Sequence, residues 1–131
     1  MIGLDTNILV RAATNDDAIR SPKARAIISA LTPGQPAVVN SVVLAEFAWT
    51  LRTGYGYKRS EIVDAIEKMM QSPCYVAPDR GAINAALIRC QSEHLDFADA
   101  LIAELNLEAG CTKTQTFDEE CSASSAFEAV T

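Results

Sequence analysis

Short apolar runs alternate with segments of helical periodicity along this chain. The opening run from Met1 to Leu4 predicts a strand, and the residues after it continue at a spacing that suits a helix. Ser21 and Pro22 resemble an N-cap followed by proline at the first helical position, and Gly110 predicts the end of a later helix. The predicted order is strand 1–4, helices 8–13 and 22–31, strand 37–39, helices 42–52 and 60–70, strand 75–77, helices 79–92 and 96–109, strand 111–114, then a short helix and a strand at 127–130.

This alternation predicts an α/β sandwich in which helices flank a central, mostly parallel sheet. The 131 residues suit one domain, residues 1–131, because no segment resembles a linker. In such folds, ligands collect beyond the carboxyl ends of the strands. Side chains that follow the predicted strands are therefore the first candidates for a functional site.

Four carboxylates lie in or against apolar segments at that edge. Asp5 and Asp118 follow strands, Glu46 lies one turn into the helix after the second strand, and Asp99 precedes an apolar helical segment. Converging carboxylates repel one another unless protons or a divalent cation neutralise them. The pattern therefore predicts a metal site, and oxygen ligands without histidine or thiolate suit Mg²⁺ better than zinc.

Each acid also has a local interpretation. Asp5 is a candidate cap for the helix that follows it, and Asp96 with Asp99 resembles a capping box. Thr116 and Glu119 resemble another around Asp118. Glu46 is the hardest to explain locally, because apolar neighbours surround it on every side of its predicted helix and burial of an unpaired carboxylate is costly.

Charge and composition narrow the range of functions. Eleven Lys and Arg against 17 Asp and Glu give a net charge of −6, which disfavours binding held mainly by phosphate contacts. Two divalent ions would bring the formal total to −2, because −6 + 4 = −2, so phosphodiester chemistry stays open. Glu119 and Glu120 beside Asp118 would repel RNA, so the cations expected to attract it lie elsewhere: Arg11, Arg52, Lys58, Arg59 or Lys113.

Several other chemistries have little support. The four cysteines, at 74, 90, 111 and 121, form no C-x-x-C pair, so we expect reduced thiols in or near the core. The lone His94 excludes paired-histidine cleavage of RNA, and we expect it at a helix end or on the surface. No phosphate-binding glycine motif occurs. No apolar run reaches the length of a membrane span, so we expect a cytoplasmic protein.

Taken together, four ordered motifs resemble the PIN domain and, more narrowly, the VapC toxins of bacterial toxin–antitoxin pairs. These motifs are Asp5-Thr6-Asn7 after an apolar start, Ser41 to Glu46 in an apolar helix, Asp96-Phe97-Ala98-Asp99-Ala100, and Thr114 to Asp118 ending in Thr116-Phe117-Asp118. The resemblance covers essentially the whole chain. It implies a three-layer PIN-like sandwich.

The resemblance also implies an endoribonuclease that uses Mg²⁺, or Mn²⁺ as a substitute, and a metal-activated water to hydrolyse RNA. Asp5, Glu46, Asp99 and Asp118 match the acidic catalytic and metal site, and Asp96 matches an accessory acid. Supporting roles are implied for Thr6, Asn7 and Thr116. A homodimer and a cognate antitoxin that covers the site are implied as well. The alternative is a catalytically inactive PIN-fold module that binds a protein partner.

Overall fold

Two small parallel sheets contain all the strands. In the computed structural model, which describes residues 1–131, one sheet has the order β1-β2-β3 and the other pairs β4 with β5. Ile2 is in register with Ala37, and Ala37 with Tyr75. The strands are β1 (Ile2–Gly3), β2 (Ala37–Val38), β3 (Tyr75–Val76), β4 (Thr114–Thr116) and β5 (Phe127–Ala129).

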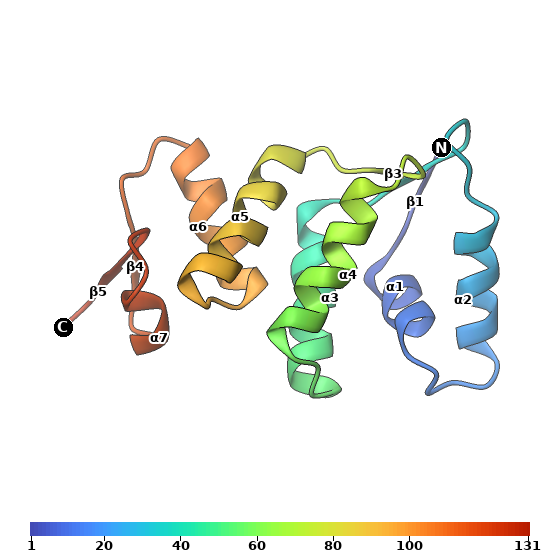
Figure 1. The fold of residues 1–131 in the computed structure, drawn as a ribbon, viewed down its shortest axis with the longest axis horizontal. Helices are drawn as coiled ribbons and strands as arrows, with labels where there is room; N and C mark the ends of the chain where they lie inside the picture. Colours follow the sequence, from blue (N-terminus) through green and yellow to red (C-terminus); the bar gives the residue numbers. More distant parts are fainter.

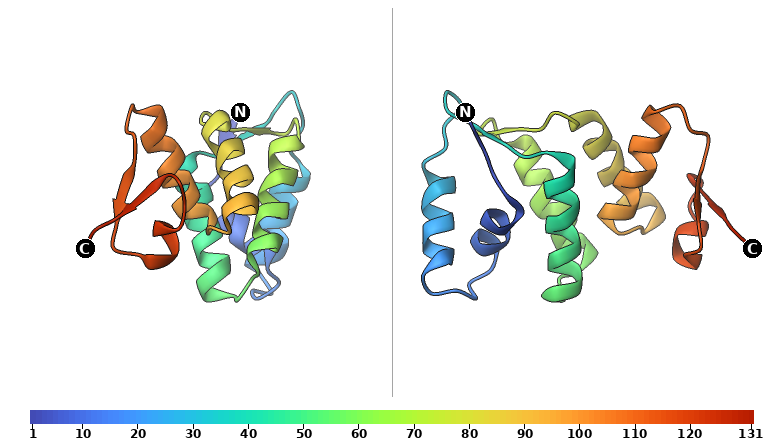
Figure 2. Two further views of the ribbon diagram at one scale, coloured as in Figure 1. Left: turned by 60° about the vertical axis from the view of Figure 1, so that its left-hand side comes forward. Right: turned by 180° about the vertical axis from the view of Figure 1, so that it is seen from behind.

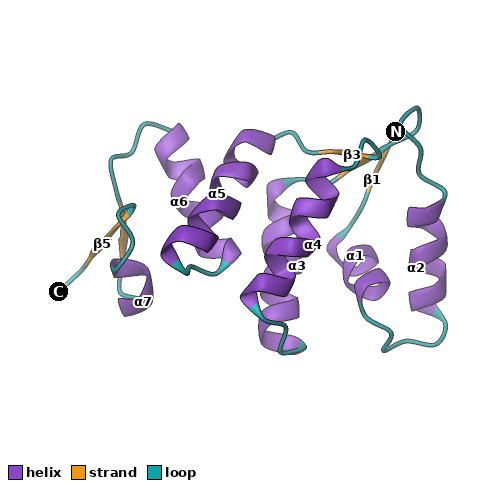
Figure 3. Ribbon diagram, viewed as in Figure 1, coloured by secondary structure: helices purple, strands orange, loops and turns teal.

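Seven helices separate and cover these strands (Figures 1 and 3). They are α1 (Thr6–Ala13), α2 (Arg20–Ser29), α3 (Ser41–Gly54), α4 (Arg59–Gln71), α5 (Arg80–Glu93), α6 (Phe97–Glu108) and α7 (Glu119–Ser122). The prediction of an α/β fold with parallel strands between helices is confirmed. None of these helices combines the length and the apolar character needed to cross a membrane.

Helices α3 and α4 stand between the two sheets. β1, α1 and α2 lie on one side of them, and α5, α6 and the segment from β4 to β5 lie on the other (Figures 1 and 2). Helix α3 packs against α1, α4 and α6, and α5 packs against α6. The expected central sheet is therefore divided, with the strand that precedes Asp118 in a different sheet from the strand that precedes Asp5.

One apolar cluster of 29 buried residues extends from Leu4 to Phe127. Its centre is α3, where Leu44, Phe47 and Leu51 are almost completely buried. Full burial of each such side chain stabilises the fold by about 1.5–3 kcal/mol before the loss of conformational entropy is counted. The core thus fixes α3 firmly and, through it, the side chains on its flanks.

The structure corrects two predicted boundaries. Ser21 is not the cap of α2: the helix begins at Arg20, and Asp17 Oδ1 accepts hydrogen bonds from the backbone N–H groups of Ile19 (3.0 Å) and Arg20 (2.7 Å). The strand predicted at 111–114 begins only at Thr114, because the Cys111 N–H still donates to the Asn106 carbonyl at the end of α6.

The cysteines and His94 lie largely where we predicted. All four thiols are free, and those of Cys90 and Cys121 are buried. Cys111 is exposed, which corrects the expectation that all four lie in or near the core. His94 ends α5 in the left-handed conformation (φ 58°), so it has the helix-end position that we expected.

Candidate active site

Asp99 and Asp118 lie close together although 19 positions separate them in sequence. Together with Cys121 they form the one group of three metal-ligating side chains whose donor atoms all lie within 4.8 Å of one another. Asp99 is half-buried, Asp118 is exposed and Cys121 is buried. The carboxylates therefore face solvent from one side, while the thiol lies on the protein side.

Local structure explains both acid positions. Asp118 caps α7, since its Oδ1 accepts a hydrogen bond from the Glu120 N–H at 2.9 Å and its own N–H donates to Thr116 Oγ1 at 2.9 Å. This contact differs from the predicted capping box of Thr116 and Glu119. Asp99 lies in the first turn of α6, where the helix dipole favours a negative charge.

The electrostatics of the group favour a cation. Burial raises the pKa of Asp99; the Cys121 thiol and Arg59 oppose the rise, whereas the charges of Asp96 and Asp118 add to it. Burial, together with Asp99 and Asp118, also raises the pKa of Cys121 to about 12, so this thiol is protonated at neutral pH. Oxygen atoms are thus the available ligands, and they suit Mg²⁺ or Mn²⁺ better than zinc.

Asp96, a third acid near Asp99 and Asp118, is paired with two arginines. Asp96 Oδ1 accepts hydrogen bonds from Arg52 Nε (3.3 Å) and Arg59 Nε (2.5 Å). Asp96 occupies the N-cap position of α6, but its side chain makes no capping bond, so the predicted capping box is absent. Its Oδ2 accepts no hydrogen bond. Asp96 therefore pairs with both arginines, and its charge also acts on Asp99.

These side chains line one pocket of about 250 Å³. Asp96, Asp99 and Asp118 line it together with Trp49, Arg52 and Arg59. Of the five cations expected to attract RNA, Arg52 and Arg59 are the two that lie here. Arg11 pairs with Asp16, and Lys113 bonds the Ser125 carbonyl.

Thr6 makes hydrogen bonds to both Asp5 and Glu46. Thr6 Oγ1 donates to Glu46 Oε1 at 3.0 Å, and Asp5 Oδ1 accepts a hydrogen bond from the Thr6 N–H at 2.8 Å as the N-cap of α1. The local interpretation of Asp5 is thus realised. Neither acid belongs to the group of Asp99 and Asp118, and the predicted supporting residue Asn7 is exposed and lines a different pocket.

The expected burial of Glu46 is wrong. Glu46 is exposed, and so are Val42 (66%) and Trp49 (65%), which lie four residues before it and three residues after it. These positions share one helical face, and all three of their side chains are exposed. The apolar composition around Glu46 therefore reflects an exposed apolar stripe, and the cost of a buried charge does not arise.

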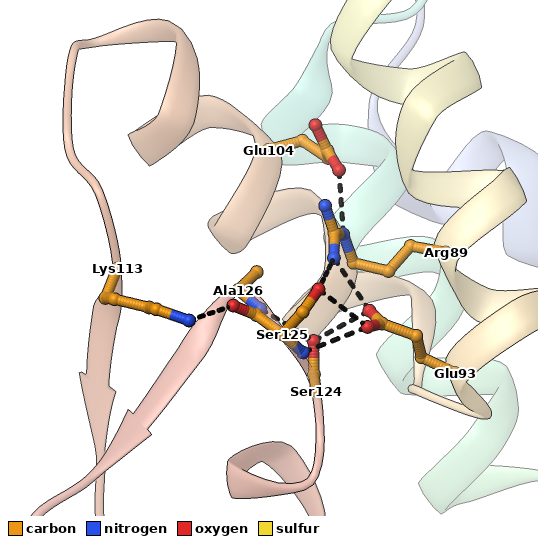
Figure 4. Close-up of polar contacts among 7 residues, drawn as sticks. All are labelled: Arg89, Glu93, Glu104, Lys113, Ser124, Ser125 and Ala126. Atoms are coloured by element: carbon orange, nitrogen blue, oxygen red, sulfur yellow. Dashed lines mark hydrogen bonds and ion pairs between the residues drawn. The ribbon is translucent and has the colours of Figure 1, made fainter.

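A polar cluster fastens the segment that carries Asp118 (Figure 4). Glu93 on α5 accepts hydrogen bonds from Ser124 Oγ (2.7 Å), from Ser125 N–H and Oγ (both 3.0 Å), and from Arg89 (2.7 Å). Arg89 also contacts Glu104 on α6 at 2.8 Å. The cluster thus joins α5, α6 and the turn between α7 and β5, and it holds the chain directly after α7.

Sequence reasoning missed Cys121 and Trp49 as neighbours of the acids. Cys121 lies three positions after Asp118, so even one helical turn brings the two together, and that spacing was the available signal. Trp49 and Arg52 are likewise three apart on α3 and line the same pocket. An aromatic ring and a guanidinium on one helix face are a recognisable pattern for nucleic-acid contact.

The fold and site define an α/β protein with an acidic pocket flanked by arginines. The family model described as PIN domain matches residues 2–125, and the chain therefore belongs to the PIN domain family. PIN domains are generally nucleases that act on nucleic acid and typically use a divalent metal. The fold agrees with a PIN-like three-layer sandwich. A search of curated proteins found no match.

Proposed function

We propose that this protein is a metal-dependent endoribonuclease and the VapC-type toxin of a bacterial toxin–antitoxin pair. One observation carries the proposal: in a member of the PIN family, the carboxylates of Asp99 and Asp118 lie within 4.8 Å in a pocket that Arg52 and Arg59 also line. Acids without a cation would repel each other there, and the arginines supply the positive charge that an RNA phosphate requires.

Asp99 and Asp118 would hold Mg²⁺ or Mn²⁺. In the proposal Asp5 and Glu46 complete the site, with Thr6, Asn7 and Thr116 supporting it and Asp96 as an accessory acid through its free Oδ2. When bound, the metal supplies the water nucleophile at neutral pH and neutralises charge on the phosphate and the leaving oxygen. No side chain of this protein needs to be the nucleophile. The expected products carry a 5′-phosphate and a 3′-hydroxyl.

The side chains of this protein perform three tasks in that reaction. Thr116 Oγ1 accepts a hydrogen bond from the backbone N–H of Asp118, and Glu46 accepts one from the Thr6 hydroxyl. These hydrogen bonds restrict the positions of Asp118 and Glu46. Arg59 reduces the negative charge around Asp99. Arg52 and Arg59, held by Asp96, are placed to contact an incoming phosphate.

The test is cleavage of a structured RNA by the purified protein. We expect cleavage with Mg²⁺ or Mn²⁺, none with EDTA, and none by Asp5→Asn or Asp99→Asn proteins that keep their helical circular dichroism. Asp64→Asn, which changes an exposed acid paired with Lys68, should cleave like the unaltered protein. Unchanged cleavage by either of the first two variants would contradict the proposal. Mapping RNA 5′ ends after brief induction in cells, with Asp5→Asn as control, identifies the target.

The toxin assignment includes two partners that the resemblance implies. One is a second copy of this chain, and the other is an antitoxin that covers the active site in the cytoplasm. Light scattering of the purified protein tests the homodimer, and co-expression with the product of a neighbouring gene tests the antitoxin. Growth arrest that the neighbour relieves is expected; arrest that persists equally with Asp99→Asn contradicts the toxin assignment.

A second candidate function is a PIN-fold module that binds a protein without catalysis. The observation that favours it is the position of Asp5 and Glu46 outside the group of Asp99 and Asp118. This candidate predicts no thermal shift with Mg²⁺ or Mn²⁺ and no cleavage of any RNA. Either a metal-dependent shift that needs Asp99 or metal-dependent cleavage rejects it.

A further inference from the structure

Trp49 exposes a large aromatic surface at the edge of the acidic pocket. Its side chain is 65% exposed and lines the pocket together with Asp99 and Asp118. The exposed part of this indole does not stabilise the fold, because the burial energy of an aromatic side chain comes from leaving water. A flat ring beside a charged pocket can instead stack on a nucleobase, a contact that suits every base.

The arginines beside Trp49 are oriented, and each keeps an unused terminal nitrogen. Arg52 uses Nε for Asp96 and Nη1 for the Tyr57 carbonyl (3.2 Å), so its Nη2 has no partner. Arg59 uses Nε for Asp96 and Nη2 for Glu120 (3.2 Å), so its Nη1 has none. Guanidinium groups held in this way lose little entropy when they bind a phosphate.

The two arginines are the positively charged part of a pocket whose lining also contains the carboxylates of Asp96, Asp99 and Asp118. The protein has a net charge of −6, yet two arginines share the single carboxylate of Asp96 here. Glu120 is the other acid that contacts Arg59, and its side chain is 78% exposed. An exposed ion pair of this kind contributes little, so a phosphate can displace the glutamate.

We propose that the pocket is a subsite for one unpaired nucleotide of a single-stranded RNA segment. The base stacks on Trp49, and the attached phosphate contacts Arg52 and Arg59. The neighbouring phosphodiester then lies beside Asp99 and Asp118. This subsite rests on the proposed function, since it states how the RNA of that function is held.

The requirement for an unpaired base follows from duplex geometry. In an A-form helix the faces of each base are covered by its neighbours, so none is free for an indole. A loop or single strand exposes those faces, and binding then costs no unstacking of a paired base. The subsite therefore predicts a preference for single strands over duplexes of the same length.

The single tryptophan of the chain makes this preference measurable. The protein is titrated with an eight-nucleotide single-stranded RNA and with a duplex of the same length, in EDTA so that no cleavage occurs. We expect the single strand to quench the Trp49 fluorescence and the duplex to leave it nearly unchanged. In parallel, anisotropy of a labelled single strand should show roughly tenfold weaker binding for Trp49→Leu and a smaller loss for Trp49→Phe.

The arginine contacts have their own readout in the dependence of affinity on salt. The slope of log K against log salt should fall by roughly 0.7 for Arg52→Gln and again for Arg59→Gln, because each removes one phosphate contact. Glu120→Gln should bind more tightly, since it removes the competing carboxylate. Arg25→Gln, the same change in charge on α2 away from the pocket, should leave the slope unaltered.

The outcomes separate this subsite from the proposed function. The proposal is overturned when no single strand quenches Trp49, when the duplex quenches it equally, or when Arg25→Gln lowers the slope as much as Arg52→Gln. Quenching by the single strand, with the expected changes in salt slope but no cleavage in Mg²⁺, would support the subsite and reject the nuclease function. Cleavage without quenching would do the reverse.

Discussion

Thr6 donates its hydroxyl hydrogen bond to Glu46 at 3.0 Å across 40 positions of sequence. The contact joins the first turn of α1 to α3, so the N-terminal motif and the acid of the apolar helix meet in space. It thereby fixes Glu46 Oε1 and leaves Oε2 without a hydrogen bond on an exposed side chain. Since Asp5 directly precedes Thr6, the orientation of Glu46 depends on the same turn that Asp5 caps.

This contact predicts a functional loss without a stability loss. Thr6→Val removes an exposed hydrogen bond, which should change the free energy of unfolding by less than about 1 kcal/mol. Loss of a hydrogen bond that orients a metal ligand should slow Mg²⁺-dependent cleavage roughly tenfold or more. Thr32→Val, which removes an exposed loop bond to the Gln35 N–H, is the matched control. Equal rates for both variants would exclude Glu46 from the reaction.

The acidic pair predicts opposite effects of one substitution with and without metal. In EDTA, Asp99→Asn should raise the melting temperature, because a half-buried carboxylate beside Asp118 is lost. With metal at 100 times its dissociation constant, the unaltered protein should gain about 2.7 kcal/mol, and Asp99→Asn should gain almost nothing. Calorimetric melting with and without Mg²⁺ checks both. A similar gain in the two proteins would place the ion elsewhere.

The sequence predicted the order of the elements well because their signals are local. The apolar runs and Gly110 at the end of α6 depend on neighbouring residues. The capping roles of Asp5 and Asp118 are local in the same way. Such features are therefore accessible without a structure.

What the sequence missed depends on packing between distant segments. Composition around Glu46 cannot show that its face is exposed, because that depends on the positions of α1, α4 and α6. The sharing of Asp96 by two arginines requires α3, α4 and α6 to be placed first. The division of the strands into two sheets likewise follows from long-range pairing, which short strands specify weakly.

The cluster around Glu93 predicts how stability changes in acid. Burial opposes ionisation of Glu93, but the hydrogen bonds from Ser125, Ser124 and Arg89 outweigh it and lower its pKa to about 2 from 4.5. A lowered carboxyl pKa gives stability that is complete above about pH 4.5 and is lost as the pH falls towards 2. The side chain is 21% exposed, so we expect a contribution of roughly 1–3 kcal/mol.

Glu93→Gln isolates that contribution. The difference in free energy of unfolding between the two proteins should be largest at pH 7 and should shrink between pH 4.5 and pH 2. Urea denaturation at each pH measures it, and Asp64→Asn serves as an exposed control. Hydrogen exchange should quicken first in the segment from β4 to β5 (Figure 4). A difference that stays constant across this range would show that Glu93 does not hold the segment by its charge.

Ser21 offers a substitution that should stabilise the protein. Its hydroxyl is fully buried inside α2 and has no hydrogen-bond partner, so it loses hydration without compensation. Ser21→Ala removes that group and also introduces a better helix former, for an expected gain of about 1–2 kcal/mol. Ser29→Ala at the exposed end of α2 changes helix propensity alone and should gain only a few tenths. Melting curves of both variants separate the effect of helix propensity from that of the buried hydroxyl. An equal gain in stability for the two variants would mean that helix propensity accounts for the whole gain. A loss of stability in Ser21→Ala would mean that the hydroxyl is hydrogen-bonded in solution.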